Sequence, residues 1–304
     1  MDKILRKMLL SLGKWRLAKR WAKKYGLRFG ASRFVAGETI QQSIAAVRQL
    51  NESGRLATLD HLGEYVSNED EAIQAADMCI QTLDAIASSG MQSHLSLKMT
   101  SLGLDLSKEL CVSNMQRILD RARLHGIFVR IDMEDYAHCQ ISIDVFKELR
   151  NLYDNVGIVL QAYLFRTLQD AADMHRLGAN LRLVKGAYKE SPKVAYPAKE
   201  DVDENYRKLI QMHLANGHYT AIASHDEAII HFTKQYVKEY NIPNDRFEFQ
   251  MLYGICEDLQ HTLVSAGYRV RIYVPYGHDW FGYFMRRLAE RPANVWFVLK
   301  HIFK

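Results

Sequence analysis

The clearest chemical signal in the sequence lies near the C-terminus, where two adjacent arginines precede a glutamate. After the apolar run 270–276 comes HDWFGYFMRRLAERPAN, which predicts a helix with Arg286, Arg287 and Glu290 on adjacent turns. Paired guanidinium groups suit bidentate binding of a carboxylate. The same spacing is also common on solvated helix faces, where an arginine pairs with a glutamate one turn away. The segment therefore indicates either an anion site or an exposed ion pair.

Polar and charged residues also lie at or near the ends of short apolar runs. They are Glu64, Lys98, Asp132, Gln161, Arg182, Lys185, His225, Gln250 and Tyr273. Any one of them alone is typical of a solvated strand edge. Arg182 differs because it lies inside LRLVK, between apolar neighbours, and a guanidinium there needs an anion or several acceptors, such as a flavin or a phosphate. Together these residues favour an active site.

Eight short apolar runs alternate with helical stretches after Gly54. The runs are 57–63, 94–98, 128–133, 157–161, 181–185, 221–224, 247–251 and 270–276, and the helical stretches include 69–89, 107–125, 141–153, 167–177, 203–217, 225–240 and 255–266. This alternation predicts a parallel α/β sheet, and eight strands can close into a barrel with apolar strand interiors. A doubly wound open sheet is the alternative, but no GxGxxG opens any of the helices. A (βα)8 barrel would gather the polar strand ends at one mouth.

The composition allows one large core. The chain has 304 residues, of which 48% are hydrophobic and 25% charged, and this excludes a disordered or fibrous protein. The four cysteines show no CxxC pair and no metal-ligand spacing, so we expect no metal site and a reducing, cytosolic setting. We expect each to be a small core residue: Cys79, Cys111, Cys139 and Cys256.

The positive charge is concentrated at the N-terminus. Residues 1–33 hold eleven Lys or Arg and one acidic residue, while the remainder carries a formal charge of −5. Apolar residues recur at helical spacing among these cations: Ile4, Met8, Leu12, Trp15, Leu17 and Trp21. This pattern predicts a basic amphipathic helix, without a signal peptide or an apolar stretch long enough to span a membrane. Residues 1–28 could bind an anionic membrane surface, or the helix could pack on the barrel; nucleic acid is a weaker alternative, and we expect none.

Four strings carry a resemblance to a known family. KGAY (185–188), RIYVPYG (271–277), FMRRLAERPAN (284–294) and RIDMED (130–135) together resemble the proline dehydrogenases, from about Gly37 to Lys304. The resemblance implies a distorted (βα)8 TIM-type barrel over 37–304, after a helical segment over 1–36. It also implies FAD-dependent oxidation of L-proline to Δ1-pyrroline-5-carboxylate, with electrons passed to a membrane quinone. No aldehyde dehydrogenase domain follows, so the chain looks like the monofunctional bacterial type.

The resemblance implies roles for individual residues around the substrate. The proline carboxylate would be bound by Lys98, Arg286 and Arg287, with Glu290 balancing their charge. The pyrrolidine ring would be contacted by Tyr188, Leu252 and Tyr273. Asp132 would lie next to the substrate, and Glu64 would pair with Arg286 as a gate over the site.

A second set would hold the cofactor. Arg182 would lie near the flavin N5, where it would stabilise negative charge in the reaction. The other FAD contacts would be Met133, Gln161, Lys185, Gly186, Ala187, Ser224 and His225. We expect the small residues Gly186 and Ala187 to let the backbone approach the cofactor closely.

Three alternatives remain open. Lys98 or Lys185 could form a Schiff base in a barrel aldolase or lyase. The barrel could also be a non-enzymatic adaptor recruited to membranes by the basic helix, although this leaves the polar strand ends without a role. Within the family, hydroxyproline could be the substrate, but Tyr273 at the ring-contact position favours proline. We expect a cytoplasmic protein that associates peripherally with the inner face of the membrane.

Overall fold

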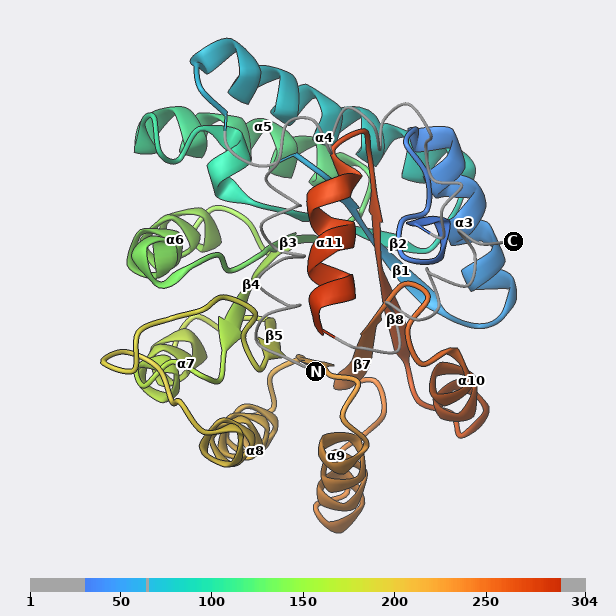
Figure 1. Cartoon of the computed structure of the whole chain (residues 1–304), viewed down its shortest axis with the longest axis vertical. Coiled ribbons are helices and arrows are strands. Elements are labelled where there is room, and N and C mark those ends of the chain that lie inside the picture. Colours follow the sequence, from blue (N-terminus) through green and yellow to red (C-terminus); the bar gives the residue numbers. More distant parts are fainter. Residues whose placement is uncertain (1–30, 64–65, 291–304) are drawn as a thin grey trace.

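Eight parallel strands close into a barrel in the order of the sequence (Figure 1). The computed structural model describes residues 31–63 and 66–290. The strands are β1 (Leu56–His61), β2 (Ser93–Leu97), β3 (Val129–Ile131), β4 (Val156–Gln161), β5 (Leu181–Val184), β6 (Thr220–Ala223), β7 (Phe247–Leu252) and β8 (Val270–Tyr276). β8 pairs with β1 in register from Leu56 opposite Arg271, which closes the ring. The expected barrel is confirmed, and the open sheet is excluded.

Seven helices of the described chain surround the barrel, each following a strand (Figure 1). They are α4 (Glu69–Ser89), α5 (Lys108–Leu124), α6 (Tyr136–Arg150), α7 (Thr167–His175), α8 (Lys199–Ala215), α9 (Glu227–Glu239) and α10 (Glu257–Ser265), and a short turn, η3 (Met99–Leu102), follows β2. The sequence placed the start of α6 at residue 141, which is wrong by five residues. The Asp135 side chain accepts a hydrogen bond from the His138 N–H and so begins the helix earlier.

Among the described residues, one further helix precedes the barrel. After the turn η2 (Ala31–Arg33), α3 (Ile40–Glu52) begins at a capping box formed by Thr39 and Gln42. It packs against β1, β8 and α4. The predicted basic amphipathic helix lies in residues 1–30, outside the described residues, and the division of the chain at residue 36 stays a prediction.

The last described helix departs from the regular βα pattern. α11 (Trp280–Glu290) lies across the end of the barrel and not in the outer ring of helices (Figure 1). Its Trp280, Phe284 and Leu288 pack with Leu62 after β1 and Ile255 after β7. Because both of these residues follow strands, α11 covers the C-terminal mouth. The position of α11 across the mouth is the departure of this barrel from the regular (βα)8 form.

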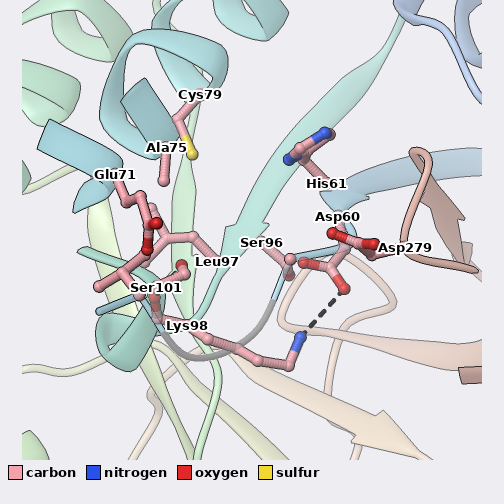
Figure 2. Close-up of a pocket in the computed structure, with 12 residues that line it drawn as sticks. Asp60, His61, Glu71, Ala75, Cys79, Ser96, Leu97, Lys98, Ser101 and Asp279 are labelled. Atoms are coloured by element: carbon pink, nitrogen blue, oxygen red, sulfur yellow. Dashed lines mark hydrogen bonds and ion pairs between the residues drawn. The ribbon is translucent and has the colours of Figure 1, made fainter. Parts of the chain in front are cut away.

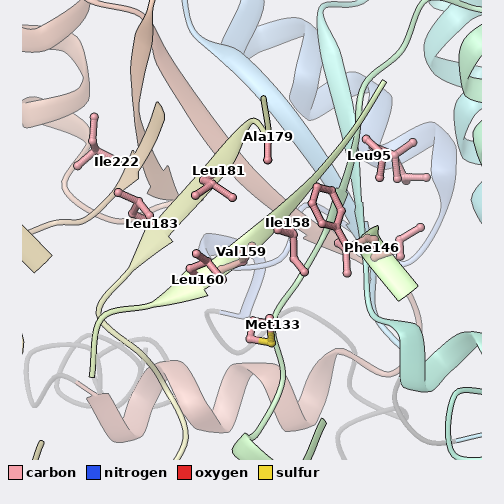
Figure 3. Close-up of a cluster of buried hydrophobic side chains, with 14 of the residues drawn as sticks. Leu95, Met133, Phe146, Ile158, Val159, Leu160, Ala179, Leu181, Leu183 and Ile222 are labelled. Atoms are coloured by element: carbon pink, nitrogen blue, oxygen red, sulfur yellow. The ribbon is translucent and has the colours of Figure 1, made fainter. Parts of the chain in front are cut away.

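Apolar packing lies mainly between the strands and the outer helices. Figure 3 shows Ile158 and Leu160 of β4 and Leu181 of β5 in this cluster, together with Phe146 of α6. The barrel interior is polar instead, contrary to the expectation from sequence. Its buried members include Thr58, Asp60, Ser96, Arg130, Arg182, Glu248, Gln250 and Arg271. They alternate with the outward apolar residues of the same strands, and most of them bond to polar side chains across the barrel, whereas Arg130 donates to Ile158 O and Asn180.

The cysteines behave as expected from their spacing. Cys79, Cys111 and Cys139 are buried and Cys256 is half-buried. Burial raises the pKa of Cys79 to about 12, so this thiol stays protonated. Across residues 31–63 and 66–290, none of the helices combines the length and apolarity needed to cross a bilayer.

Candidate active site

Arg182 lies at the centre of the polar interior, near the mouth. Its guanidinium donates to Asp132 Oδ1 at 2.6 Å, to Gln250 Oε1 at 2.6 Å and to Ser96 Oγ at 2.9 Å. The alternation along β5 turns Arg182 inward between the outward-facing Leu181 and Leu183. The sequence predicted that this buried guanidinium needs several acceptors, and three side chains from β2, β3 and β7 supply them.

The Tyr273 hydroxyl joins two carboxyl groups. It lies 2.6 Å from Asp60 Oδ2 and 2.7 Å from Asp132 Oδ2. Its ring also faces the Arg182 guanidinium, 5.4 Å from the ring centroid. Burial raises the pKa of Tyr273 well above its usual value, and the two carboxylates raise it further, so the phenol stays protonated.

Lys98 completes this upper network, which we define as Asp60, Ser96, Lys98, Asp132, Arg182 and Tyr273. Its Nζ lies 3.1 Å from Asp60 Oδ2 and 4.0 Å from Asp132 Oδ2. Figure 2 shows the Lys98–Asp60 pair at the wall of a cavity of about 200 Å³, which we call the side pocket. His61, Asp279 and the α4 residue Cys79 also line it.

Asp60 is a residue that the sequence analysis missed. It is 1% exposed, and burial raises its pKa, whereas Lys98 opposes the shift. The search for polar residues at strand ends passed over it because it precedes the last residue of β1. A carboxylate two residues after Thr58, on the same face of an otherwise apolar run, was the signal that could have identified it.

A second polar cluster lies deeper in the barrel. We define this lower network as Tyr219, Glu248 and Arg271. The Arg271 Nε donates to the two carboxylate oxygens of Glu248 at 2.8 and 3.1 Å, and the Tyr219 hydroxyl donates to the same carboxylate at 2.9 Å. Burial alone would raise the pKa of Glu248, but Arg271 outweighs it and lowers that pKa to about 2. Gln250 links the networks, because it donates to Glu248 Oε1 at 2.5 Å and accepts from Arg182.

The expected cofactor residue Lys185 lies at the end of β5. Its Nζ is 2.5 Å from Asp203 Oδ1 and 2.6 Å from Asp226 Oδ2. These carboxylates come from α8 and from the N-cap of α9, and Lys199 pairs with Asp203 as well. Lys185 therefore lies between two carboxylates, an arrangement that is unsuited to a Schiff-base nucleophile.

Gly186 lies against the ring of Tyr163. Its φ is +119°, and a Cβ at this position would lie 2.3 Å from the Tyr163 ring. Glycine is therefore required by the close approach of Tyr163 in the loop after β4. Ala187 and Tyr188 follow in the exposed loop, and Tyr188 is 38% exposed.

The other expected cofactor contacts lie at the ends of β3, β4 and β6. Met133 and Gln161 are buried, and the Gln161 side chain donates to the Glu134 carbonyl at 2.9 Å. Ser224 Oγ accepts from the Asp226 N–H at 3.1 Å. His225 Nε2 accepts from the Leu252 N–H at 2.9 Å, which leaves Nδ1 to carry the ring proton.

The expected carboxylate-binding residues lie on α11. Arg286 and Arg287 are both half-buried on the helix that crosses the mouth, and the Arg287 guanidinium lies over the Tyr283 ring at 5.0 Å. Their partial burial differs from a fully exposed helix face, and the carboxylate site stays a prediction. Leu252, at the end of β7, packs against the apolar cluster that includes Trp280 and Phe284 of α11. Glu64 and the Glu290 side chain lie outside the described residues, so the gate and the charge balance stay predictions.

A closed (βα)8 barrel with a charged network at its C-terminal mouth has the architecture of a barrel enzyme, since active sites of this fold lie at that end. The model of the family described as proline dehydrogenase matches residues 43–300. The chain belongs to the proline dehydrogenase family.

Individual relatives agree with this assignment. The chain is 52% identical to proline dehydrogenase 2 of Bacillus subtilis strain 168, over 99% of both chains. It is 44% identical to the proline dehydrogenase of Deinococcus radiodurans, over 90% of each. Among solved structures it is similar to proline utilization A of Bdellovibrio bacteriovorus inactivated by N-propargylglycine, with 28% identity and a TM-score of 0.82 over 90% of this chain. The chain spans 34% of the length of that solved chain.

Proposed function

We propose that this protein catalyses the FAD-dependent oxidation of L-proline to Δ1-pyrroline-5-carboxylate. Family membership supports an oxidoreductase that acts on proline. The observation that carries the proposal is the upper network at a mouth crossed by α11, because it places Lys98, Tyr273 and two half-buried arginines at one end of the barrel. Such a site suits a small substrate with a carboxylate.

The residues at the mouth fit FAD by their chemistry. Arg182, Gln161, Ser224 and His225 supply N–H and O–H groups at the ends of neighbouring strands, which suit the carbonyl and phosphate oxygens of a flavin nucleotide. We propose that FAD is held by these four residues together with Met133, Lys185, Gly186 and Ala187. FAD supplies the hydride acceptor when it is bound. Arg182 would stabilise the negative charge that then develops nearby.

The substrate would be oriented at both ends. Arg286, Arg287 and Lys98 would bind its carboxylate, while Tyr188, Leu252 and Tyr273 would contact its ring. Several cations near the site would lower the pKa of the substrate ammonium group, which must lose a proton for the oxidation. The protein contributes mainly by this positioning.

The direct test is the absorption spectrum of the purified protein before and after anaerobic addition of proline. We expect flavin bands that proline alone bleaches. A colourless protein to which borohydride covalently attaches a carbonyl substrate would support the Schiff-base alternative. Faster bleaching by hydroxyproline than by proline would identify hydroxyproline as the substrate.

The carboxylate assignment gives the first prediction. Arg286→Met or Arg287→Met should raise KM for proline roughly 10–100-fold, because each charge-assisted hydrogen bond contributes about 1.5–3 kcal/mol. FAD should remain bound. Arg117→Met, which removes an exposed arginine on α5, is the matched control and should leave KM unchanged. An unaltered KM in the α11 variants would refute the assignment.

We further propose that electrons pass to a membrane quinone and that residues 1–28 bind the cytoplasmic face of the membrane. The support is the cluster of Lys and Arg among apolar residues, each cation contributing about 1 kcal/mol near an anionic surface. The test compares sedimentation with anionic and neutral liposomes. Equal sedimentation of the full chain and a chain lacking residues 1–28 would contradict this part of the proposal.

A further inference from the structure

The Tyr273 hydroxyl contacts two carboxyl groups, and the number of protons they share decides whether both contacts are hydrogen bonds. Tyr273 has a single O–H to donate, yet its oxygen lies 2.6 Å from Asp60 Oδ2 and 2.7 Å from Asp132 Oδ2. Two ionised carboxylates cannot both be satisfied by that one hydrogen. Both contacts become hydrogen bonds when one carboxyl carries a proton and donates it to the phenol oxygen. The row Asp60–Tyr273–Asp132 is therefore built to accept one additional proton.

The surroundings determine which carboxyl group takes it. Asp132 Oδ1 pairs with the Arg182 guanidinium at 2.6 Å, so this carboxyl group has a buried cation as its own partner. Asp60 is 1% exposed, and its nearest cation, Lys98, lies 3.1 Å away. Burial raises the pKa of Asp60, Lys98 opposes the shift, and the negative charge of Asp132 adds to it. The additional proton therefore belongs on Asp60.

This inference rests on the proposed oxidation of proline, which places Tyr273 against the substrate ring. We propose that Asp60 takes up, through the Tyr273 hydroxyl, the proton that the substrate amine loses. The N–H bond of the substrate breaks and an O–H bond forms at the phenol, while the phenol's own proton passes to the Asp60 carboxylate. One positive and one negative charge disappear together, and the nitrogen lone pair becomes available as hydride leaves the adjacent carbon for FAD. Asp60 is thus a positioning residue that acts through Tyr273.

The side pocket provides a route for the proton to leave. Asp60 and Lys98 form part of its wall, and its volume of about 200 Å³ leaves room for several water molecules. Figure 2 shows Asp60 and His61 of β1 opposite Glu71 and Cys79 of α4. A proton released from Asp60 can pass to water in this pocket.

Among the described residues, few other groups near Asp60 can titrate in the same pH range. The titratable and charged groups that face it or share the pocket are Lys98, Asp132, Arg182, Tyr273, Tyr276, Cys79, His61, Glu71 and Asp279. Burial raises the pKa of Cys79 to about 12 and also raises that of Tyr276, so both stay neutral near neutral pH. Burial lowers the pKa of His61, so its ring is uncharged there as well.

The test is the variant Asp60→Asn in the FAD-loaded enzyme. Asparagine keeps the shape and can still bond to Lys98 and Tyr273, but it cannot take up a proton. Flavin reduction by proline, followed anaerobically from pH 6 to 10, should be roughly 10²–10⁴-fold slower at pH 7. The rate should then rise about tenfold per pH unit, because only proline that is already deprotonated would react. Tetrahydrofuran-2-carboxylate has no amine proton, and its affinity should stay within about threefold of the wild-type value.

Thr58→Val is the matched control on the same strand. Thr58 faces the interior and contacts Ser96 Oγ at 3.3 Å, so this variant should keep the wild-type pH profile. An unchanged rate and profile in Asp60→Asn would overturn the proposal, and so would an equal loss of rate and of analogue affinity. If Asp60→Asn does not fold, the wild-type profile decides: a tenfold rise per pH unit up to the pKa of free proline, without levelling, overturns it. Wild-type flavin that proline cannot reduce refutes the proposed function instead.

Discussion

The two polar networks inside the barrel differ in how completely their charges are matched. In the lower network, Glu248 accepts hydrogen bonds from Arg271, Tyr219 and Gln250, and it is 1% exposed. In the upper network, two carboxyl groups share the Tyr273 hydroxyl, and Lys98 lies at the edge of a pocket. The lower pattern suits a structural ion pair, whereas the upper one leaves room for a proton and for a substrate. Burial alone therefore does not distinguish a structural charge from a functional one.

The largest effect that tests this comparison is on stability. Glu248→Gln leaves Arg271 buried without its anion, and we expect a loss of about 3–5 kcal/mol in the free energy of unfolding. Urea unfolding measures it. The double variant Glu248→Gln/Arg271→Met should recover part of the loss, since it removes the unpaired charge as well. An equal change in the free energy of unfolding in Glu248→Gln and Asp60→Asn would show that the two networks do not differ in this way.

The dependence of stability on pH should have opposite signs in the two networks. The pKa of Glu248 falls from 4.5 in the unfolded chain to about 2 in the fold, so its contribution is present above pH 4.5 and is lost as the pH falls toward 2. At about 1.4 kcal/mol per pKa unit this amounts to roughly 3 kcal/mol. The pKa of Asp60 is raised above 3.8, so its ionisation destabilises the fold as the pH rises.

Unfolding experiments between pH 3 and 8 separate these contributions. The deficit of Glu248→Gln relative to the wild type should shrink as the pH falls. Asp60→Asn should be more stable than the wild type at pH 8, and this advantage should also shrink toward pH 4. If both variants were destabilised at pH 8, the proposed difference between the networks would be wrong.

The smallest effect concerns the link between the networks. Gln250→Leu leaves Arg182 Nε and Glu248 Oε1 each without one partner, and we expect a loss of about 1–3 kcal/mol in stability together with slower flavin reduction. Gln260→Leu is the matched control, because Gln260 is a buried glutamine that bonds to Arg55 and Ile255 outside the barrel. It should lower stability without changing the rate. An equal change of rate in both variants would contradict the role of Gln250.

The sequence predicted the barrel and many of its polar groups, for identifiable reasons. Each strand and helix carries its own hydrophobic period, so the alternation could be recognised locally. Arg182 was conspicuous because it carries a charge between apolar neighbours, although Arg130, Glu248 and Arg271 share this pattern and were missed. Its partners could not be named, since Gln250 and Ser96 reach it only when strands far apart in the sequence close the ring.

Other features depend on tertiary packing and were missed. Asp60 was missed because only polar residues at strand ends were expected to face the mouth. A buried carboxyl group is tolerated inside this barrel because Lys98 and Tyr273 form hydrogen bonds with it. The position of α11 across the mouth follows from its packing with Leu62 and Ile255, which no local pattern reveals. The close approach of Tyr163 to Gly186 was also missed, because it joins two loops that follow different strands.

Gln250 has a consequence that goes beyond its two hydrogen bonds. A carboxylate or an imidazole at position 250 could relay a proton between the upper network and Glu248. An amide neither gains nor loses a proton near neutral pH. Its carbonyl faces the guanidinium and its NH2 group faces the carboxylate, so the amide cannot turn over without breaking both bonds. The Gln250 side chain therefore cannot pass a proton between the upper and lower networks. The upper network can change its protonation state while the lower network keeps its own.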